Sequence, residues 1–136
     1  MQAPFVSMCL YINEAPEGQE REDLVMAIEE VFKQRILGVK NDVGVYISPA
    51  FPKLLYFLTE DNTKPGSKYW NLTRLAAECT AKRMVPDYIS EKIMLQSKID
   101  KNGKGNAFPC MGCRSFLTPY IDPETGKPKY YGRLTA

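Results

Sequence analysis

The sequence predicts an α/β fold in which parallel strands alternate with helices. Two observations lead to this prediction. Short apolar runs of strand length alternate with longer segments in which apolar residues recur at helical spacing, and the order is strand, helix, strand, helix. Such an order is typical of parallel sheets, because a helical crossover returns the chain to start the next strand in the same direction. The length of 136 residues fits one domain with a sizeable core.

The first unit is a strand followed by a long helix. Residues 6–12 form an almost continuous apolar run, which indicates a strand buried on both faces. Residues 18–37 carry apolar side chains at helical spacing, with acidic residues early and basic residues late, as the helix dipole favours. Gly38 is positioned to end this helix.

The next units repeat the pattern less clearly. Residues 43–47 predict a weak strand and residues 53–59 a strong one, whereas residues 60–68 are polar and rich in turn formers. Residues 72–84 predict a second amphipathic helix, and residues 87–98 a third, shorter one.

The character of the chain changes after residue 99. We expect strand and helix units over 1–99, a Gly- and Pro-rich loop region over 100–128 that residues 115–117 interrupt, and the start of a further strand over 129–136. A few parallel strands leave exposed sheet edges. The whole of 1–136 therefore resembles a single fragment of a larger α/β body.

Charge and targeting signals exclude several classes of function. The chain holds 18 Lys+Arg against 16 Asp+Glu, a net charge of +2, and the two signs are interspersed. This is too little for an electrostatic interaction with nucleic acid or an anionic membrane. No apolar run approaches the ~20 residues of a membrane helix, and the N-terminus lacks the pattern of a signal peptide. We expect a cytoplasmic protein that binds neither nucleic acid nor membrane.

The residue inventory restricts the available chemistry further. The sequence contains no histidine, which removes Ser–His and Cys–His nucleophile pairs and histidine metal sites. Four cysteines are too few for a disulfide scaffold. Chemistry here must rest on Cys, carboxylates, Lys, Arg or Tyr.

The most suggestive stretch is a Cys-x-x-Cys pair, Cys110 and Cys113. It has three readings. It is half of a zinc site that Cys9 and Cys79 would have to complete, a thiol–disulfide redox pair, or a loop that holds one reactive cysteine. In the third reading, Gly112 lets the backbone pass close to another group. The spacing alone does not choose among them.

The residues around the pair resemble a known family. Residues 110–117, Cys-Met-Gly-Cys-Arg-Ser-Phe-Leu, resemble the loop of anaerobic (class III) ribonucleoside-triphosphate reductases, which are glycyl-radical enzymes. The resemblance extends in one register along nearly the whole chain. It includes residues 2–6, 29–30, 33–35, 49–54, 60–62, 75–79 and 81–87.

The resemblance implies a fold and a role for the cysteine loop. The family builds a ten-stranded α/β barrel from two parallel five-stranded halves, and a finger loop carries a cysteine into its centre. Cys113 matches that cysteine, whose family role is to become a thiyl radical that abstracts the 3′-hydrogen of the ribose. The resemblance makes three neighbours accessory: Cys110, accessory or neutral; Gly112, which lets the loop tip approach the glycyl-radical loop; and Arg114, either a structural ion pair or a contact to substrate phosphate.

Other chemically suggestive residues have plainer interpretations. Cys79 and Cys9 are expected in the core, where a free cysteine behaves as a small hydrophobe. Residues 61–62 are expected in a loop, and residues 82–83 on a solvated helix face.

The resemblance also implies cofactors and partners. The substrate is a ribonucleoside triphosphate, and the full enzyme is a homodimer activated by a radical-SAM activase that uses S-adenosylmethionine and an iron–sulfur cluster. The glycyl radical and a four-cysteine zinc site belong to a C-terminal part that these 136 residues do not contain. We therefore expect a fragment that is inactive by itself. The alternative is a small non-catalytic module whose Cys-x-x-Cys loop binds a metal or a partner.

Overall fold

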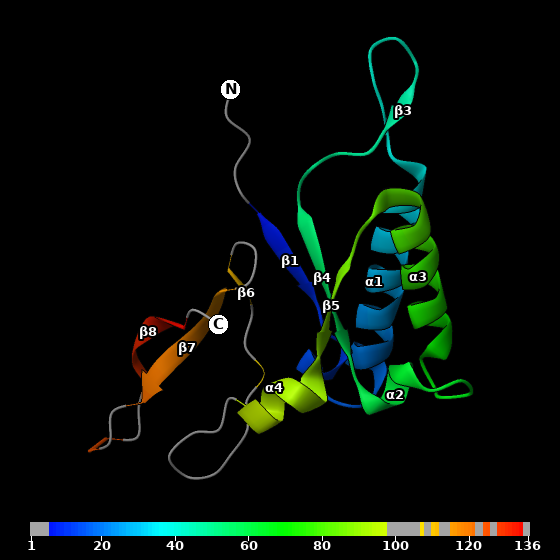
Figure 1. Ribbon diagram of the computed structural model, residues 1–136. Helices are drawn as coiled ribbons and strands as arrows, with labels where there is room; N and C mark the ends of the chain where they lie inside the picture. Colours follow the sequence, from blue (N-terminus) through cyan, green and yellow to red (C-terminus); the bar gives the residue numbers. More distant parts are fainter. Residues whose placement is uncertain are drawn as a thin grey trace. The chain divides into compact units, whose positions relative to one another are not determined.

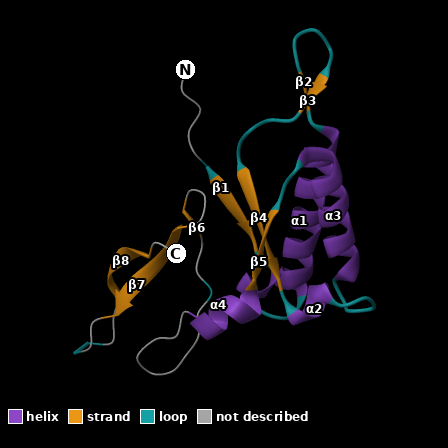
Figure 2. Ribbon diagram, viewed as in Figure 1, coloured by secondary structure: helices purple, strands orange, loops and turns teal. Residues whose placement is uncertain are grey.

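The structure, a computed structural model, describes residues 6–97, 107, 110–111, 115–121, 124–125 and 128–134. The chain divides into two compact units, Met1–Lys92 and Ile93–Ala136, and each is described by itself. The first unit contains a parallel sheet with helices, and the second contains an antiparallel sheet (Figures 1 and 2).

The first unit is built on a parallel sheet in the order β1-β4-β5. Its strands are β1 (Ser7–Leu10), β4 (Lys53–Leu58) and β5 (Asp87–Ser90). Two long helices, α1 (Gln19–Leu37) and α3 (Trp70–Arg83), lie side by side against one face of this sheet (Figure 1). The predicted α/β class with parallel strands is confirmed.

The core lies between this face of the sheet and the two helices. Phe32 of α1 meets Tyr56 of β4 edge to face, with ring centroids 5.4 Å apart, and Ala76 of α3 is fully buried beside them. Burial of each large apolar side chain contributes roughly 1.5–3 kcal/mol.

Among the described helices, none is long and apolar enough to cross a membrane.

The burial on both faces that was predicted for the first strand is wrong, and the central strand shows it instead. In β4 the side chains from Leu54 to Phe57 are at most 2% exposed, so both faces are covered. In β1, by contrast, Met8 is 39% exposed, because β1 lies at the edge of the sheet. Its strand ends at Leu10, and the short 3-10 helix η1 (Ile12–Glu14) follows.

The predicted helix over 18–37 is confirmed as α1, and Gly38 ends it with a φ of 85°. The predicted strand over 43–47 is partly wrong. Only β3 (Tyr46–Ile47) is extended there, and it pairs antiparallel with β2 (Val39–Lys40) in a hairpin that extends beyond the end of α1 (Figure 1). The side chain of Asn41 closes the turn by accepting the backbone N–H of Val45 at 2.8 Å.

Two further helical predictions need correction. The polar segment 60–68, expected as a turn, contains a short helix, α2 (Glu60–Thr63), whose start is held by the Asn62 side chain, which accepts the backbone N–H of Thr59 at 2.8 Å. The segment 87–98, expected as one helix, is strand β5 followed by α4 (Glu91–Ser97). Pairing with β4, in which Ile89 lies opposite Phe57, holds residues 87–90 extended and overrides the local pattern.

The second unit holds an antiparallel sheet in the order β6-β7-β8. Its strands are β6 (Cys110–Met111), β7 (Ser115–Ile121) and β8 (Pro128–Leu134). The expected loop region over 100–128 therefore contains strands, and its apolar interruption extends to Ile121. Pro119 fits within β7 because, among the described residues, β8 alone pairs with this part of β7, and the described pairing of β6 with β7 reaches only Phe116. The strand expected from residue 129 is confirmed as β8.

Candidate active site

In the sequence, the predicted reactive cysteine falls between β6 and β7, two strands that pair with each other. Strands β6 and β7 are antiparallel, with Cys110 opposite Phe116 and Met111 opposite Ser115. The three residues between them, Gly112, Cys113 and Arg114, lie outside the described residues. Their predicted roles therefore remain predictions. The pairing of their neighbours means that only three residues link the two strands.

The pairing with β8 supports the β7 side of this hairpin. Strand β8 pairs with β7 from Phe116 opposite Leu134 to Ile121 opposite Pro128, with an irregularity next to Tyr120. A third strand matters because an isolated two-stranded hairpin is marginal in water.

The remaining cysteines do not form a metal site within the described residues. Cys79 is fully buried in α3, as expected, and this burial raises the pKa of its thiol. Cys9, expected in the core, is only half-buried in β1. No group of three or more His, Cys, Asp or Glu side chains that could hold a metal ion occurs in the part of the chain that the structure describes.

A polar cluster ties together the carboxyl ends of the outer parallel strands. Glu91, which follows β5, accepts hydrogen bonds through Oε1 from the Tyr11 hydroxyl at 2.5 Å and from Asn13 Nδ2 at 2.8 Å. The Tyr11 ring lies 4.7 Å from that of Phe57. Burial and the Glu91 carboxylate raise the pKa of Tyr11, so this hydroxyl remains a donor. Sequence reasoning missed this cluster because it predicted one helix over 87–98 and therefore did not place Glu91 at the end of a parallel strand.

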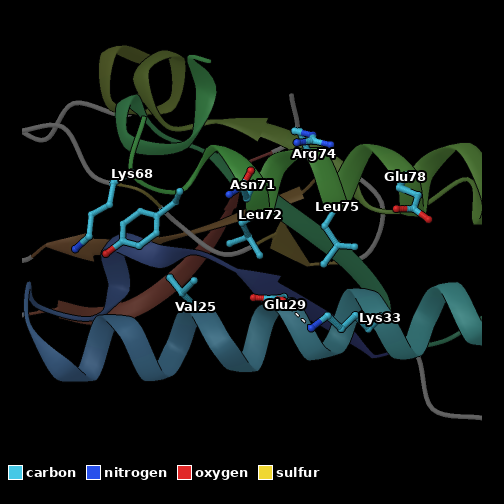
Figure 3. Close-up of a pocket in the computed structure, with 10 residues that line it drawn as sticks. Val25, Glu29, Lys33, Lys68, Asn71, Leu72, Arg74, Leu75 and Glu78 are labelled. Atoms are coloured by element: carbon cyan, nitrogen blue, oxygen red, sulfur yellow. Dashed lines mark ion pairs between the residues drawn. The ribbon is translucent and has the colours of Figure 1, made fainter. Parts of the chain in front are cut away.

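An open groove of about 610 Å³ runs between α1 and α3 (Figure 3). Its floor contains the apolar side chains of Val25, Leu72 and Leu75. Its rim carries charges of both signs, including the Glu29–Lys33 ion pair at 2.6 Å, which the dashed line in Figure 3 marks. The groove shows no convergent set of acid, base and nucleophile, so it is a mixed surface rather than a catalytic centre.

In each of two polar pairs expected at the surface, 61–62 and 82–83, the second residue is structural, whereas Asp61 and Lys82 are exposed. Asn62, expected in a loop, is fully buried, and its side chain makes three hydrogen bonds of 2.8–3.0 Å to Thr59 N, Phe57 O and the Tyr56 hydroxyl. Arg83, expected on a solvated helix face, donates from Nε and Nη2 to the carbonyl of Ile36 at 3.0 and 2.8 Å.

Comparison with known proteins gives a consistent result. The model of the family "Anaerobic ribonucleoside-triphosphate reductase" matches residues 1–135. The chain belongs to this family. It is 36% identical over 135 residues to the anaerobic ribonucleoside-triphosphate reductase of Enterobacteria phage T4, 31% identical over 106 residues to that of Haemophilus influenzae, and 28% identical over 133 residues to that of Escherichia coli.

The match covers most of this chain but little of each reductase. It takes in 97% of the chain and 20% of the phage T4 protein, 77% and 13% for Haemophilus influenzae, and 97% and 16% for Escherichia coli. The chain thus spans about a fifth or less of the length of the curated reductases that it matches.

The fold brings together two of the sequence blocks that resemble the reductases. Residues 33–35 lie in the C-terminal part of α1, and residues 49–54 form the loop before β4 and its first two residues. Arg35, only 6% exposed, joins them by donating to the carbonyl of Pro49 at 2.6 Å and to that of Pro52. Residues shared with the family here thus hold the loop that precedes the central strand.

Proposed function

We propose that this chain is part of the catalytic barrel of an anaerobic ribonucleoside-triphosphate reductase, an enzyme that converts ribonucleoside triphosphates to deoxyribonucleoside triphosphates. The family match over residues 1–135 is the observation that carries the proposal. The parallel sheet β1-β4-β5 is compatible with one portion of the ten-stranded α/β barrel that the resemblance implies.

In this proposal Cys113 is the catalytic cysteine. As a thiyl radical, its sulfur takes the 3′-hydrogen atom of the ribose, so that an S–H bond forms, the C3′–H bond breaks and the unpaired electron moves to C3′. The protein contributes positioning and the exclusion of water and oxygen. The family match, which includes the Cys-Met-Gly-Cys-Arg-Ser-Phe-Leu segment over 110–117, supports this role.

The cofactors and partners follow from the family and belong to the whole enzyme. The glycyl radical supplies the oxidising equivalent that Cys113 needs, and a radical-SAM activase with an iron–sulfur cluster installs it. We also propose that the whole enzyme is a cytoplasmic homodimer. The described residues do not fit the family's four-cysteine zinc site, and no step here involves a metal.

Two cysteine variants of the full-length reductase that contains this segment test the role of Cys113. With activase, reductant and a ribonucleoside triphosphate, Cys113→Ser should reduce product formation by at least about 10³-fold, because oxygen cannot replace the sulfur radical. Cys110→Ser, on the same hairpin, is the matched control and should retain activity within about tenfold. Equal loss in both variants, or activity in Cys113→Ser, would contradict the assignment.

Metal analysis separates this proposal from the binding-module alternative. A Cys-x-x-Cys binding module would hold stoichiometric zinc through Cys110 and Cys113 and lose it in either Cys→Ser variant. The reductase proposal expects no metal at this pair in the 136-residue chain. It also expects no reductase turnover by this chain alone, even with activase present.

A further inference from the structure

A second groove lies beside the free edge of β1, away from the α1–α3 groove. It measures about 460 Å³ and lies among β1, α1, β2 and β4. Six apolar side chains make up most of its lining: Met8, Val31, Val39, Pro49, Pro52 and Leu54. Met8 and Val39 are 39% and 56% exposed, so an apolar surface is open to solvent here.

One charged side chain that lines this groove is buried. Arg35 is 6% exposed, and its guanidinium donates to two backbone carbonyls, those of Pro49 and Pro52. No ion pair joins it to a carboxylate of the described residues. Its place in the last turn of α1 gives it a partial negative charge nearby, but not a full counter-ion.

This arrangement is electrostatically incomplete. A buried charge is normally paired, because desolvation is costly, and a guanidinium has five N–H donors, more than two carbonyls use. Burial lowers the pKa of Arg35, because desolvation disfavours the charged form of the guanidinium. Glu30, which also lines the groove, accepts a hydrogen bond from Gln34 at 2.6 Å and does not pair with Arg35.

We propose that this groove binds an apolar polypeptide segment that carries a carboxylate side chain, which pairs with Arg35. Charge complementarity identifies the carboxylate, and the apolar lining identifies its neighbours. The position identifies a polypeptide, because the groove borders the edge strand β1, whose outer side has no strand partner among the described residues. The longer reductases that this chain matches contain ample chain to supply such a segment.

The test is a titration of the 136-residue chain with synthetic peptides, followed by NMR of ¹³C-labelled methionine methyl groups. The probe is acetyl-Leu-Val-Glu-Val-Leu-amide, and its control replaces Glu with Gln. Met8 lines the groove and reports binding, whereas Met26 and Met84, which are 61% and 87% exposed and lie outside it, are internal references. We expect the Met8 signal to shift, with the Gln peptide binding at least about tenfold more weakly because a charge-assisted pair is lost.

Two variants of the β2–β3 hairpin test whether binding depends on this groove, and neither changes Arg35 or its carbonyl partners. Val39→Asp adds a negative charge inside the groove and should weaken the Glu peptide by about tenfold or more. Val43→Asp adds the same charge on the same hairpin at a site that is 82% exposed and outside the groove, and should leave binding within about twofold.

Three results would overturn the proposal. They are equal binding of the Glu and Gln peptides, no movement of Met8 at millimolar peptide, and binding of free octanoate as tight as that of the Glu peptide, which would make this a site for small acids. All of these outcomes are independent of Cys113, so the groove and the proposed reductase chemistry stand or fall separately.

Discussion

Single buried polar residues position the elements around the parallel sheet. Asn62 is the clearest case, because it is fully buried and bonds to the backbone of β4, to the start of α2 and to the Tyr56 hydroxyl. Tyr56 in turn shares a hydrogen bond of 2.9 Å with Thr73 of α3. Asn62 of α2 thereby connects directly to the end of the central strand and, through the Tyr56 hydroxyl, to α3.

Replacement of Asn62 should therefore be costly. Asn62→Ala removes three buried hydrogen bonds, of which only the Tyr56 hydroxyl keeps another side-chain partner, Thr73, and we expect it to lower the free energy of unfolding by roughly 2–4 kcal/mol. Asn71→Ala on the exposed surface of α3 is the control and should cost at most about 0.5 kcal/mol. Urea denaturation followed by circular dichroism measures both. A cost for Asn62→Ala no larger than that of Asn71→Ala would show that the buried network does not support the fold.

Tyr56 should make the fold sensitive to alkali. Burial raises its pKa to about 12, above the ordinary tyrosine value near 10. A group whose folded pKa is raised stabilises the fold fully below pH 10, and this contribution is lost as the pH rises to about 12. Stability measured by urea denaturation should fall over this range, and less steeply in Tyr56→Phe. Tyr46→Phe, at a half-exposed tyrosine, is the control. Equal slopes in wild type and Tyr56→Phe would refute the prediction.

At the scale of elements, sequence patterns predict those helices and strands whose apolar pattern agrees with how they pack in the fold. Helices α1 and α3 have clear helical spacing, and β4 is a dense apolar run that is buried on both faces. Strand β5 was missed because its four residues include only one half-buried apolar side chain, and its pairing with β4 decides its conformation. The hairpin β2–β3 and the strand β7 depend likewise on partners that local sequence does not reveal.

The sequence likewise predicts one part of the candidate site, and only the fold shows the rest. The cysteine motif was visible in the sequence because the residue types and their spacing carry the chemistry. The Tyr11–Asn13–Glu91 cluster was not visible, because its members are separated by about 80 residues and meet only when the strands align. In the sequence Arg35 is simply one residue of a helical segment, and only the fold shows that it holds the Pro49–Pro52 loop.

The junction between α1 and the hairpin gives a test at this scale. Gly38 has a φ of 85°, and a Cβ there would lie 2.5 Å from the carbonyl oxygen of Ile47. Gly38→Ala should therefore combine left-handed strain of about 1 kcal/mol with a backbone clash, and cost at least roughly 2 kcal/mol. Gly66→Ala is the matched control, because its φ of 86° is nearly the same and nothing lies within 4 Å of the added atom. Thermal unfolding that shifts equally in both variants would rule out the clash.

At the scale of the whole molecule, the parallel sheet β1-β4-β5 has both covered and exposed strands, as expected for a segment of a larger protein. The central strand β4 is buried on both faces, whereas the edge strand β1 and the β2–β3 hairpin carry exposed apolar side chains. Its family membership and its coverage of at most a fifth of the matched reductases agree with this interpretation. Activity is accordingly a property to be measured in the full-length protein.

The central claim is that Cys113 removes the 3′-hydrogen of the substrate ribose, and an isotope experiment tests it most directly. The full-length reductase that contains this segment would be activated and supplied with a ribonucleoside triphosphate carrying tritium at C3′. We predict that the wild type and Cys110→Ser transfer tritium from C3′ to the Cys113 sulfur, from which the thiol hydrogen exchanges into water when the site opens to solvent, and that Cys113→Ser releases none above background, with the glycyl radical detected by electron paramagnetic resonance in all three. Tritium release by Cys113→Ser with its radical intact would contradict the account.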